Sequence, residues 1–236
     1  MTISFSISFK IHPYSIKKML LCGIDEAGRG PVIGPLVMAG VLIDDADENK
    51  LKEIGVKDSK VLEPKEREIL FKKILGIVKA YKIISLTSDI IDDHLKSSTS
   101  NLNKLEARTT AEILNDLNPE KAIIDLPDKD VERYQGFIRK WLVNKKIELV
   151  TEHKADANYP VVSAASILAK VTRDRYIEHL KEMFGEDFGS GYSSDEKTIN
   201  FLEKHWNNNT IHFIRKQWAT WKDLKSRKGQ KSLFDF

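Results

Sequence analysis

Apolar residues along the chain follow two spacings, one typical of strands and one of helices. Leu20–Asp25 and Val32–Ile43 are apolar and β-rich, and a glycine-rich turn joins them, which predicts a hairpin. Short apolar segments at 81–86, 121–125 and 147–151 predict three further strands, and the intervening segments 64–78, 102–117 and 131–142 have helical spacing.

Strands that alternate with helices indicate an α/β fold. We therefore expect a mixed central sheet flanked by helices over residues 19–183. The last third of the chain is almost wholly helical in pattern, with helices expected at 163–183, 196–207 and 215–225. This pattern predicts a C-terminal helical cap over residues 184–226 and a flexible tail over 227–236.

Residues 1–18 are harder to assign, because apolar and polar residues alternate there before Pro13 interrupts the pattern. They fit an extra edge strand. They fit equally well a leader outside the fold, with Met19 immediately before the first core strand.

Composition and charge narrow the class of protein. The chain has 236 residues, 41% of them hydrophobic, which is enough for a substantial core. Cys22 is the single cysteine, so no intrachain disulfide or cysteine-based zinc site can form, and it is expected to be a small buried strand residue. No apolar run approaches the roughly 20 residues that span a bilayer, and the first residues lack the features of a secretory signal. We expect a soluble, cytoplasmic monomer without membrane partners.

The net charge is only +3, but the charges are unevenly distributed. Between Arg215 and Lys231, seven basic residues accompany one acid, Asp223. This segment is a candidate phosphate-facing surface. A solvated helix face is the alternative.

Two adjacent carboxylates, Asp25 and Glu26, end the first apolar run directly before the glycine-rich turn. Asp125 and Asp156 come later, beside segments of the same predicted sheet. Four acids without a histidine or cysteine cluster favour Mg²⁺ or Mn²⁺ over zinc. Two such ions about 4 Å apart suit hydrolysis of a phosphodiester. Taken singly, each acid also fits an ordinary turn or strand-end residue.

Several long motifs resemble signatures of the ribonuclease HII family, and they occur in the family's order. The first is Gly23–Pro31, with the sequence GIDEAGRGP, followed by Asp58-Ser59-Lys60. The others are Ser163–Asp174, with the sequence SAASILAKVTRD, and Gly189-Ser190-Gly191-Tyr192. The segment HKAD at 153–156, with Tyr159-Pro160, resembles the archaeal branch of the family.

This resemblance implies a ribonuclease H-like fold and a metal site made of Asp25, Glu26, Asp125 and Asp156. Asp128 and Asp130 lie close to Asp125, but only Asp125 directly ends the apolar strand. Asp156 is preferred to Asp174, because the family's acid precedes the proline and the serine-rich helix.

The resemblance also implies a ribonucleotide sensor at Gly28-Arg29-Gly30, which would grip the 2′-hydroxyl and the adjoining phosphates. Small backbone groups reach a 2′-hydroxyl that bulky side chains would block. Tyr192 would lie against the sugar on the DNA side of the junction. Without the family context, the glycine turn fits a tight hairpin and Tyr192 a half-buried tyrosine.

A polar stripe is expected along the helix at 163–183. Ser163, Ser166, Lys170 and Arg173 fall on one face, beside an apolar stripe, and can meet phosphates. The two serines fit helix caps equally well. Lys60 is a further phosphate candidate, although exposed loop lysines are usually only solvated.

The tail resembles the peptide that docks on the replication sliding clamp, with Gln230, Leu233 and Phe236 at its first, fourth and seventh positions. A disordered segment of this kind folds on binding and places apolar anchors in a groove. The alternative is a hydrophobic terminus that packs on its own domain.

The sequence therefore predicts a metal-dependent endoribonuclease, with two Mg²⁺ or Mn²⁺ ions expected during catalysis. By resemblance, it hydrolyses the RNA strand of RNA/DNA hybrids and cuts 5′ of ribonucleotides embedded in duplex DNA, leaving a 3′-hydroxyl and a 5′-phosphate. One alternative is a non-catalytic nucleic-acid-binding module recruited by the clamp. Another is a nucleotide-cofactor enzyme, but the glycine turn misses the dinucleotide-binding spacing by one residue and leads into a strand.

Overall fold

The computed structural model describes residues 18–56 and 62–234, with side chains as far as Gln230. Five strands form one mixed sheet in the order β3-β2-β1-β4-β5. The strands are β1 (Leu20–Ala27), β2 (Leu36–Asp44), β3 (Ala80–Leu86), β4 (Lys121–Asp125) and β5 (Glu148–Glu152). The first three are antiparallel neighbours, whereas β4 runs parallel to both β1 and β5. The predicted hairpin and the predicted α/β class are confirmed.

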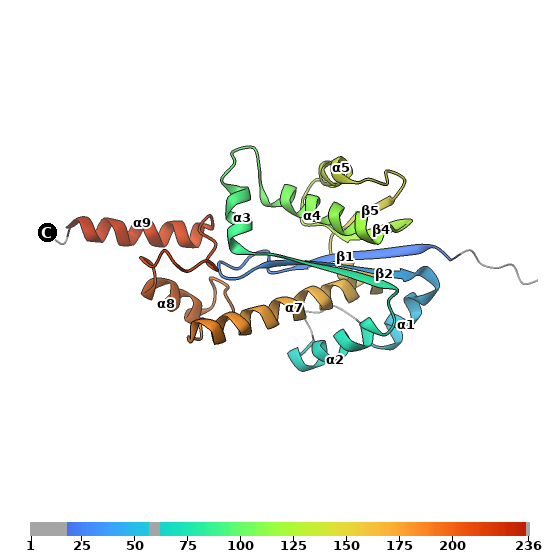
Figure 1. Ribbon diagram of the computed structural model, residues 1–236, viewed down its shortest axis with the longest axis horizontal. Coiled ribbons are helices and arrows are strands. Elements are labelled where there is room, and N and C mark those ends of the chain that lie inside the picture. Colours follow the sequence, from blue (N-terminus) through green and yellow to red (C-terminus); the bar gives the residue numbers. More distant parts are fainter. Residues whose placement is uncertain (1–17, 57–61, 235–236) are drawn as a thin grey trace, which may run out of the picture.

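Helices cover both faces of the sheet (Figure 1). On one face lie α1 (Glu48–Glu53), α2 (Pro64–Leu75) and the long α7 (Pro160–Phe184). The other face is covered mainly by α4 (Leu102–Leu117) and α5 (Val131–Trp141). A 3₁₀ turn, Asp45–Asp47, and the short helices α3 (Ser88–Leu95) and α6 (Ala155–Asn158) complete this layered part.

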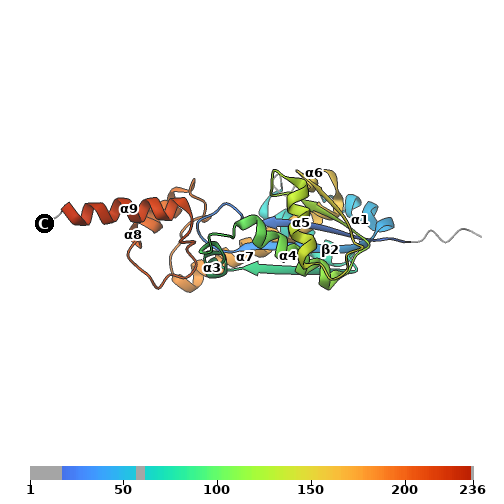
Figure 2. The same cartoon turned by 90° about the horizontal axis from the view of Figure 1, so that it is seen from above.

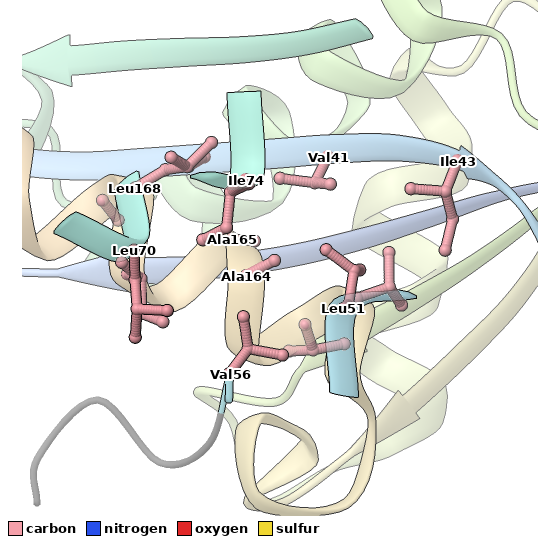
Figure 3. Close-up of a cluster of buried hydrophobic side chains, with 14 of the residues drawn as sticks. Val41, Ile43, Leu51, Val56, Leu70, Ile74, Ala164, Ala165 and Leu168 are labelled. Atoms are coloured by element: carbon pink, nitrogen blue, oxygen red, sulfur yellow. The ribbon is translucent and has the colours of Figure 1, made fainter. Parts of the chain in front are cut away.

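Successive side chains of a strand point to opposite faces of the sheet, so the apolar core consists of one cluster on each face. In β2, Val41 and Ile43 contribute to the cluster beneath α7, and Leu42 to the cluster beneath α4. Figure 3 shows the first cluster, in which strand residues meet Leu51 of α1, Ile74 of α2 and the small residues of α7. Apolar area removed from water stabilises such a layer by about 25 cal/mol per Å².

The C-terminal region lies beyond one end of the sheet (Figure 2). It contains α8 (Glu196–Lys204) and α9 (Ala219–Phe234). A third apolar cluster joins it to the rest of the molecule, since Phe188, Phe201 and Trp221 pack with Val32 and Ile33 of the turn after β1. The loop that follows the acidic pair is thus packed against the C-terminal region.

Two expectations need correction here. The last helix was predicted over 215–225 with a flexible tail from 227, whereas α9 begins at Ala219 and continues to Phe234. Arg215 was included in the candidate phosphate-facing segment, but its side chain is fully buried and cannot belong to an exposed surface.

Several predicted features lie outside the described residues, namely residues 1–17, Lys60 and Phe236. In the described part of the chain, none of the helices is long and apolar enough to cross a membrane.

Candidate active site

An acidic pocket of about 250 Å³ lies where β1 and β4 end side by side. The register of the two parallel strands pairs Ile24 with Ile124, so Asp25 and Asp125 are the next residues on neighbouring strands and occupy the same end of the sheet. Asp156 reaches the pocket from α6, whose position is fixed when the Ala155 N–H donates to Asp125 Oδ1 at 2.8 Å. The pocket lining brings together residues far apart in the sequence: Asp25, Glu26, Ala27, Gly28, Arg29, Gly30, Asp125, Asp156, Ser166, Lys170, Arg173 and Tyr192.

Asp25 and Glu26 point to opposite faces of the sheet, because successive strand residues alternate. On the α7 side, Asp25 accepts a hydrogen bond from Ser166, and Asp125 and Asp156 lie near enough to repel it. On the α4 side, Glu26 feels the charge of Glu106. Both carboxylates still line the same pocket, because they stand at the end of the strand.

Burial and mutual repulsion make it unfavourable for all the carboxylates of the pocket to be ionised at once. Burial, with repulsion from Asp125 and Asp156, raises the pKa of Asp25 to about 7, although the Ser166 hydrogen bond lowers it. Burial and then the charge of Asp25 raise the pKa of Glu26 well above its usual value. A bound cation would relieve this repulsion.

The donor chemistry fits a hard divalent cation, since four carboxylates supply only oxygen ligands. In the described residues, no three carboxylate, histidine or cysteine side chains are already gathered as a metal-binding group. The opposite directions of Asp25 and Glu26 account for part of this separation.

The glycine turn forms the neighbouring wall of the pocket. Gly28 has a φ of +85°, and an added Cβ would lie 2.6 Å from the Pro35 carbonyl oxygen, so this position requires glycine. A Cβ on Gly30 would meet only the Tyr192 ring, at 3.7 Å. Internal packing therefore leaves open space over Gly30.

The side chain of Arg29 is turned toward α4. Its Nε donates to Glu106 Oε1 at 2.9 Å, and its Nη2 donates to Asn103 Oδ1 at 2.7 Å. Glu106 is fully buried, and burial raises the pKa of Glu106 to about 7 even though the Arg29 charge lowers it. Sequence reasoning missed Glu106 and Asn103, since helical spacing alone does not reveal which polar residue faces inward.

The polar stripe of α7 reaches the pocket only in part. Ser166, Lys170 and Arg173 line it, whereas Ser163 is buried and is not among the lining residues. Because α7 begins at Pro160, three residues earlier than predicted, both serines lie inside the helix and neither is its cap. Arg173 also donates to the Ser190 carbonyl at 3.0 Å and lies over the Tyr192 ring, 5.2 Å from its centroid.

Sequence and structure comparisons agree with this geometry. The family model for ribonuclease HII matches residues 22–221. The ribonuclease HII of Pyrococcus furiosus is 47% identical over 226 residues, which cover 92% of this chain and 98% of that protein.

Solved structures show the same relationship. The crystal structure of ribonuclease H2 from Pyrococcus horikoshii superposes with a TM-score of 0.81 at 43% identity, covering 89% of this chain and 98% of that one. Ribonuclease HII of Archaeoglobus fulgidus, solved as a complex with PCNA, gives a TM-score of 0.77 at 41% identity over 85% of this chain and 96% of that one.

A mixed sheet flanked by helices, with carboxylates at the adjoining ends of two parallel strands, defines a nuclease of the ribonuclease H-like class. Within this class, the chain belongs to the ribonuclease HII family. It is a ribonuclease H enzyme, whose substrates are RNA/DNA hybrids.

Proposed function

We propose that the enzyme is a metal-dependent endoribonuclease that also cuts duplex DNA on the 5′ side of an embedded ribonucleotide. The observation that carries this proposal is that four carboxylates and the Gly28-Arg29-Gly30 turn share one pocket. A site for phosphodiester hydrolysis thereby lies next to a turn whose small backbone groups can reach a 2′-hydroxyl.

In this proposal, Asp25, Glu26, Asp125 and Asp156 hold two Mg²⁺ or Mn²⁺ ions. Ions held there would supply an activated water and would neutralise charge on the leaving oxygen. The water oxygen would lose a proton to solvent and form a bond to phosphorus, while the bond from phosphorus to the 3′-oxygen breaks and that oxygen takes up a proton. The products carry a 3′-hydroxyl and a 5′-phosphate.

The remaining lining residues bind and orient the substrate. Gly28, Arg29 and Gly30 contact the ribonucleotide, and Tyr192 packs on the adjoining deoxyribose. Tyr192 is suited to this contact because its side chain is exposed while Arg173 supports its ring from the protein side. Lys170, whose pKa is lowered by burial, lines the same pocket, with its Nζ 3.8 Å from Asp174 Oδ1, and would contact a phosphate.

A cleavage assay tests the proposal. The enzyme is incubated with a DNA duplex that contains one ribonucleotide, with Mg²⁺, Mn²⁺ or a chelator, beside an all-DNA duplex. We expect one cut, 5′ of the ribonucleotide, only with metal and only in the first duplex. Equal cutting of both duplexes, or cutting in the presence of chelator, would contradict it.

We also propose that the C-terminal segment from Gln230 binds a sliding clamp. Its support is the peptide pattern at Gln230, Leu233 and Phe236, together with the clamp complex solved for the Archaeoglobus fulgidus relative. The helix α9 carries this segment away from the sheet (Figure 1), so the clamp and the nucleic acid would engage different parts of the molecule.

A further inference from the structure

Arg215 is a buried cation that the proposed chemistry does not use. Its side chain is fully buried, and the hydrogen bonds described for it go to backbone carbonyl groups and not to a carboxylate. Burial lowers the pKa of Arg215 to about 9, so the guanidinium keeps its charge at neutral pH. A buried charge without a carboxylate partner is costly, and it persists only when other groups satisfy its donors.

Backbone carbonyl groups of the glycine turn satisfy those donors. Arg215 Nη2 donates to the Gly28 oxygen at 2.6 Å, Nη1 to the Arg29 oxygen at 3.0 Å and Nε to the Gly34 oxygen at 2.9 Å. The Trp218 Nε1–H donates to the Gly30 oxygen at 2.9 Å. Three successive carbonyl groups of the turn are therefore held by two side chains from the C-terminal region.

These contacts fix the direction of the turn's N–H groups. All described peptide bonds are trans, and in a trans peptide the C=O and N–H point in opposite directions. Because the Gly28 and Arg29 oxygens face Arg215, the N–H groups of Arg29 and Gly30 point away from it. Neither N–H donates to another described residue.

The positive charge strengthens these two N–H groups as donors. A carbonyl oxygen that accepts from a guanidinium is polarised, and hydrogen-bonded groups in series reinforce one another. Two adjacent backbone N–H groups above a buried cation form a favourable place for a phosphate or a hydroxyl oxygen. Gly28, Arg29 and Gly30 all line the acidic pocket, so the pocket is where such a ligand would enter.

The Arg215 segment is itself held in place. The N–H groups of Lys216 and Gln217 both donate to the buried Asp92 of α3, at 2.6 and 3.0 Å, and the Arg215 N–H donates to the Val32 oxygen at 2.8 Å. The Arg215 guanidinium also lies over the Trp218 ring, 4.7 Å from its centroid. The two side chains form one rigid unit beneath the turn.

We propose that Arg215 and Trp218 are positioning residues that set the enzyme's discrimination between ribonucleotide and deoxyribonucleotide, by holding the Arg29 and Gly30 N–H groups toward the substrate. The inference rests on the proposed role of the turn in reading the ribonucleotide. It assigns part of substrate specificity to the C-terminal region, outside the sheet that carries the acids.

The test compares binding of two duplexes, one with a single ribonucleotide and one of DNA only, by fluorescence anisotropy in chelator so that neither is cut. The quantity measured is the ratio of the two dissociation constants, which does not depend on the fraction of folded protein. Trp218→Phe keeps the ring over Arg215 and removes only the N–H donor. We expect this variant to lower the ratio about threefold, the effect of one exposed hydrogen bond.

Arg215→Lys keeps the charge but cannot reach three carbonyl groups at once, and we expect it to lower the ratio at least about tenfold. If that variant does not fold, Trp218→Phe still decides the question. Trp221→Phe is the matched control, because it makes the same change in the same apolar cluster and no hydrogen bond to the turn is described for Trp221. The control should keep the wild-type ratio.

Each outcome is informative. A wild-type enzyme that binds both duplexes equally would contradict the role of the turn in reading the ribonucleotide, and with it the positioning role. A wild-type enzyme that discriminates, with a folded Trp218→Phe variant that keeps the full ratio, would overturn the positioning role and leave the proposed function intact. If Trp218→Phe and Trp221→Phe lower the ratio of dissociation constants equally, the effect comes from a general loss of packing in the C-terminal region. That result would also overturn the positioning role.

Discussion

Gly28 and Gly30 flank Arg29 but are glycines for different reasons. Gly28 has a left-handed backbone and no room for a Cβ, so the fold itself requires it. Gly30 has no positive φ and faces open space next to Tyr192, so the fold does not require it. If glycine is required at position 30, the requirement therefore comes from substrate binding and not from folding.

We expect Gly30→Ala to fold with a free energy of unfolding within about 1 kcal/mol of wild type. The same variant should cut the single-ribonucleotide duplex with kcat/KM lower by about tenfold or more, because its methyl group fills space that the sugar needs. Thermal melting and steady-state kinetics measure the two effects. Wild-type kcat/KM in a folded variant would contradict the role of Gly30.

Glu106 makes protein stability depend on pH. Its folded pKa of about 7 exceeds its ordinary value of 4.5, so the folded state binds this proton more tightly than the unfolded state. The Glu106 contribution to stability therefore falls as pH rises from about 4.5 to about 7.

Glu106→Gln removes this dependence and keeps an oxygen that accepts from Arg29. We expect the melting temperature of the variant, relative to wild type, to rise between about pH 5 and about pH 8. Thermal melts across this range measure the difference. A difference that stays constant, or that shrinks as pH rises, would rule out Glu106 as the titrating group.

At the scale of elements, two helices approach the sheet closely at glycines on its opposite faces. A Cβ on Gly23 of β1 would lie 2.4 Å from backbone atoms of Val161 in α7. A Cβ on Gly40 of β2 would lie 2.3 Å from the Ile113 side chain of α4. Side chains can turn aside more easily than a helix backbone can shift.

Gly23→Ala should therefore destabilise the protein by about 3 kcal/mol or more, and Gly40→Ala by about 1 to 2 kcal/mol. Urea unfolding measures both free energies. The two variants control for each other, since each adds one methyl group to a neighbouring central strand. A Gly40→Ala variant that is the less stable of the two would contradict this account of the packing.

The sequence predicted the five strands and the longer helices, and missed three short helices. The strand at 121–125 and the helix at 102–117 have the predicted bounds, because apolar spacing and nearby Pro119 define them. The helices α1, α3 and α6 were not predicted, since four to eight largely polar residues carry little periodic signal.

The candidate site divides in the same way. The four acids were identified from strand ends and from motifs that resemble those of the ribonuclease HII family, and all four line the pocket. The contacts of Glu106, Arg215 and Trp218 with the glycine turn join residues that are far apart in the sequence, with separations of 77, 187 and 188 residues. A single sequence does not show such pairing.

At the scale of the whole molecule, α9 extends beyond the end of the sheet, away from α4 and α5 (Figure 2). Truncation after Gly229 should therefore leave cleavage of the ribonucleotide duplex unchanged and abolish binding to a sliding clamp. Cleavage rates and clamp affinity are measured on the same preparation, with Leu233→Ala as the finer variant. Clamp binding that survives truncation would remove this segment as the docking site.

The central claim is that the fold assembles one metal site from β1, β4 and α6. Asp125 and Asp130 provide a direct comparison within one short segment. Asp125 ends β4 in the pocket, whereas Asp130 caps α5 by accepting from the Arg133 N–H at 2.9 Å. Asparagine caps a helix as well as aspartate does, so Asp130→Asn is a matched control.

The most direct measurement is the single-turnover rate of cutting at one embedded ribonucleotide, in Mg²⁺, for wild type, Asp125→Asn and Asp130→Asn. The account predicts a loss of at least about a hundredfold for Asp125→Asn and a wild-type rate for Asp130→Asn. A wild-type rate for Asp125→Asn, or an equal loss in both variants, would contradict it.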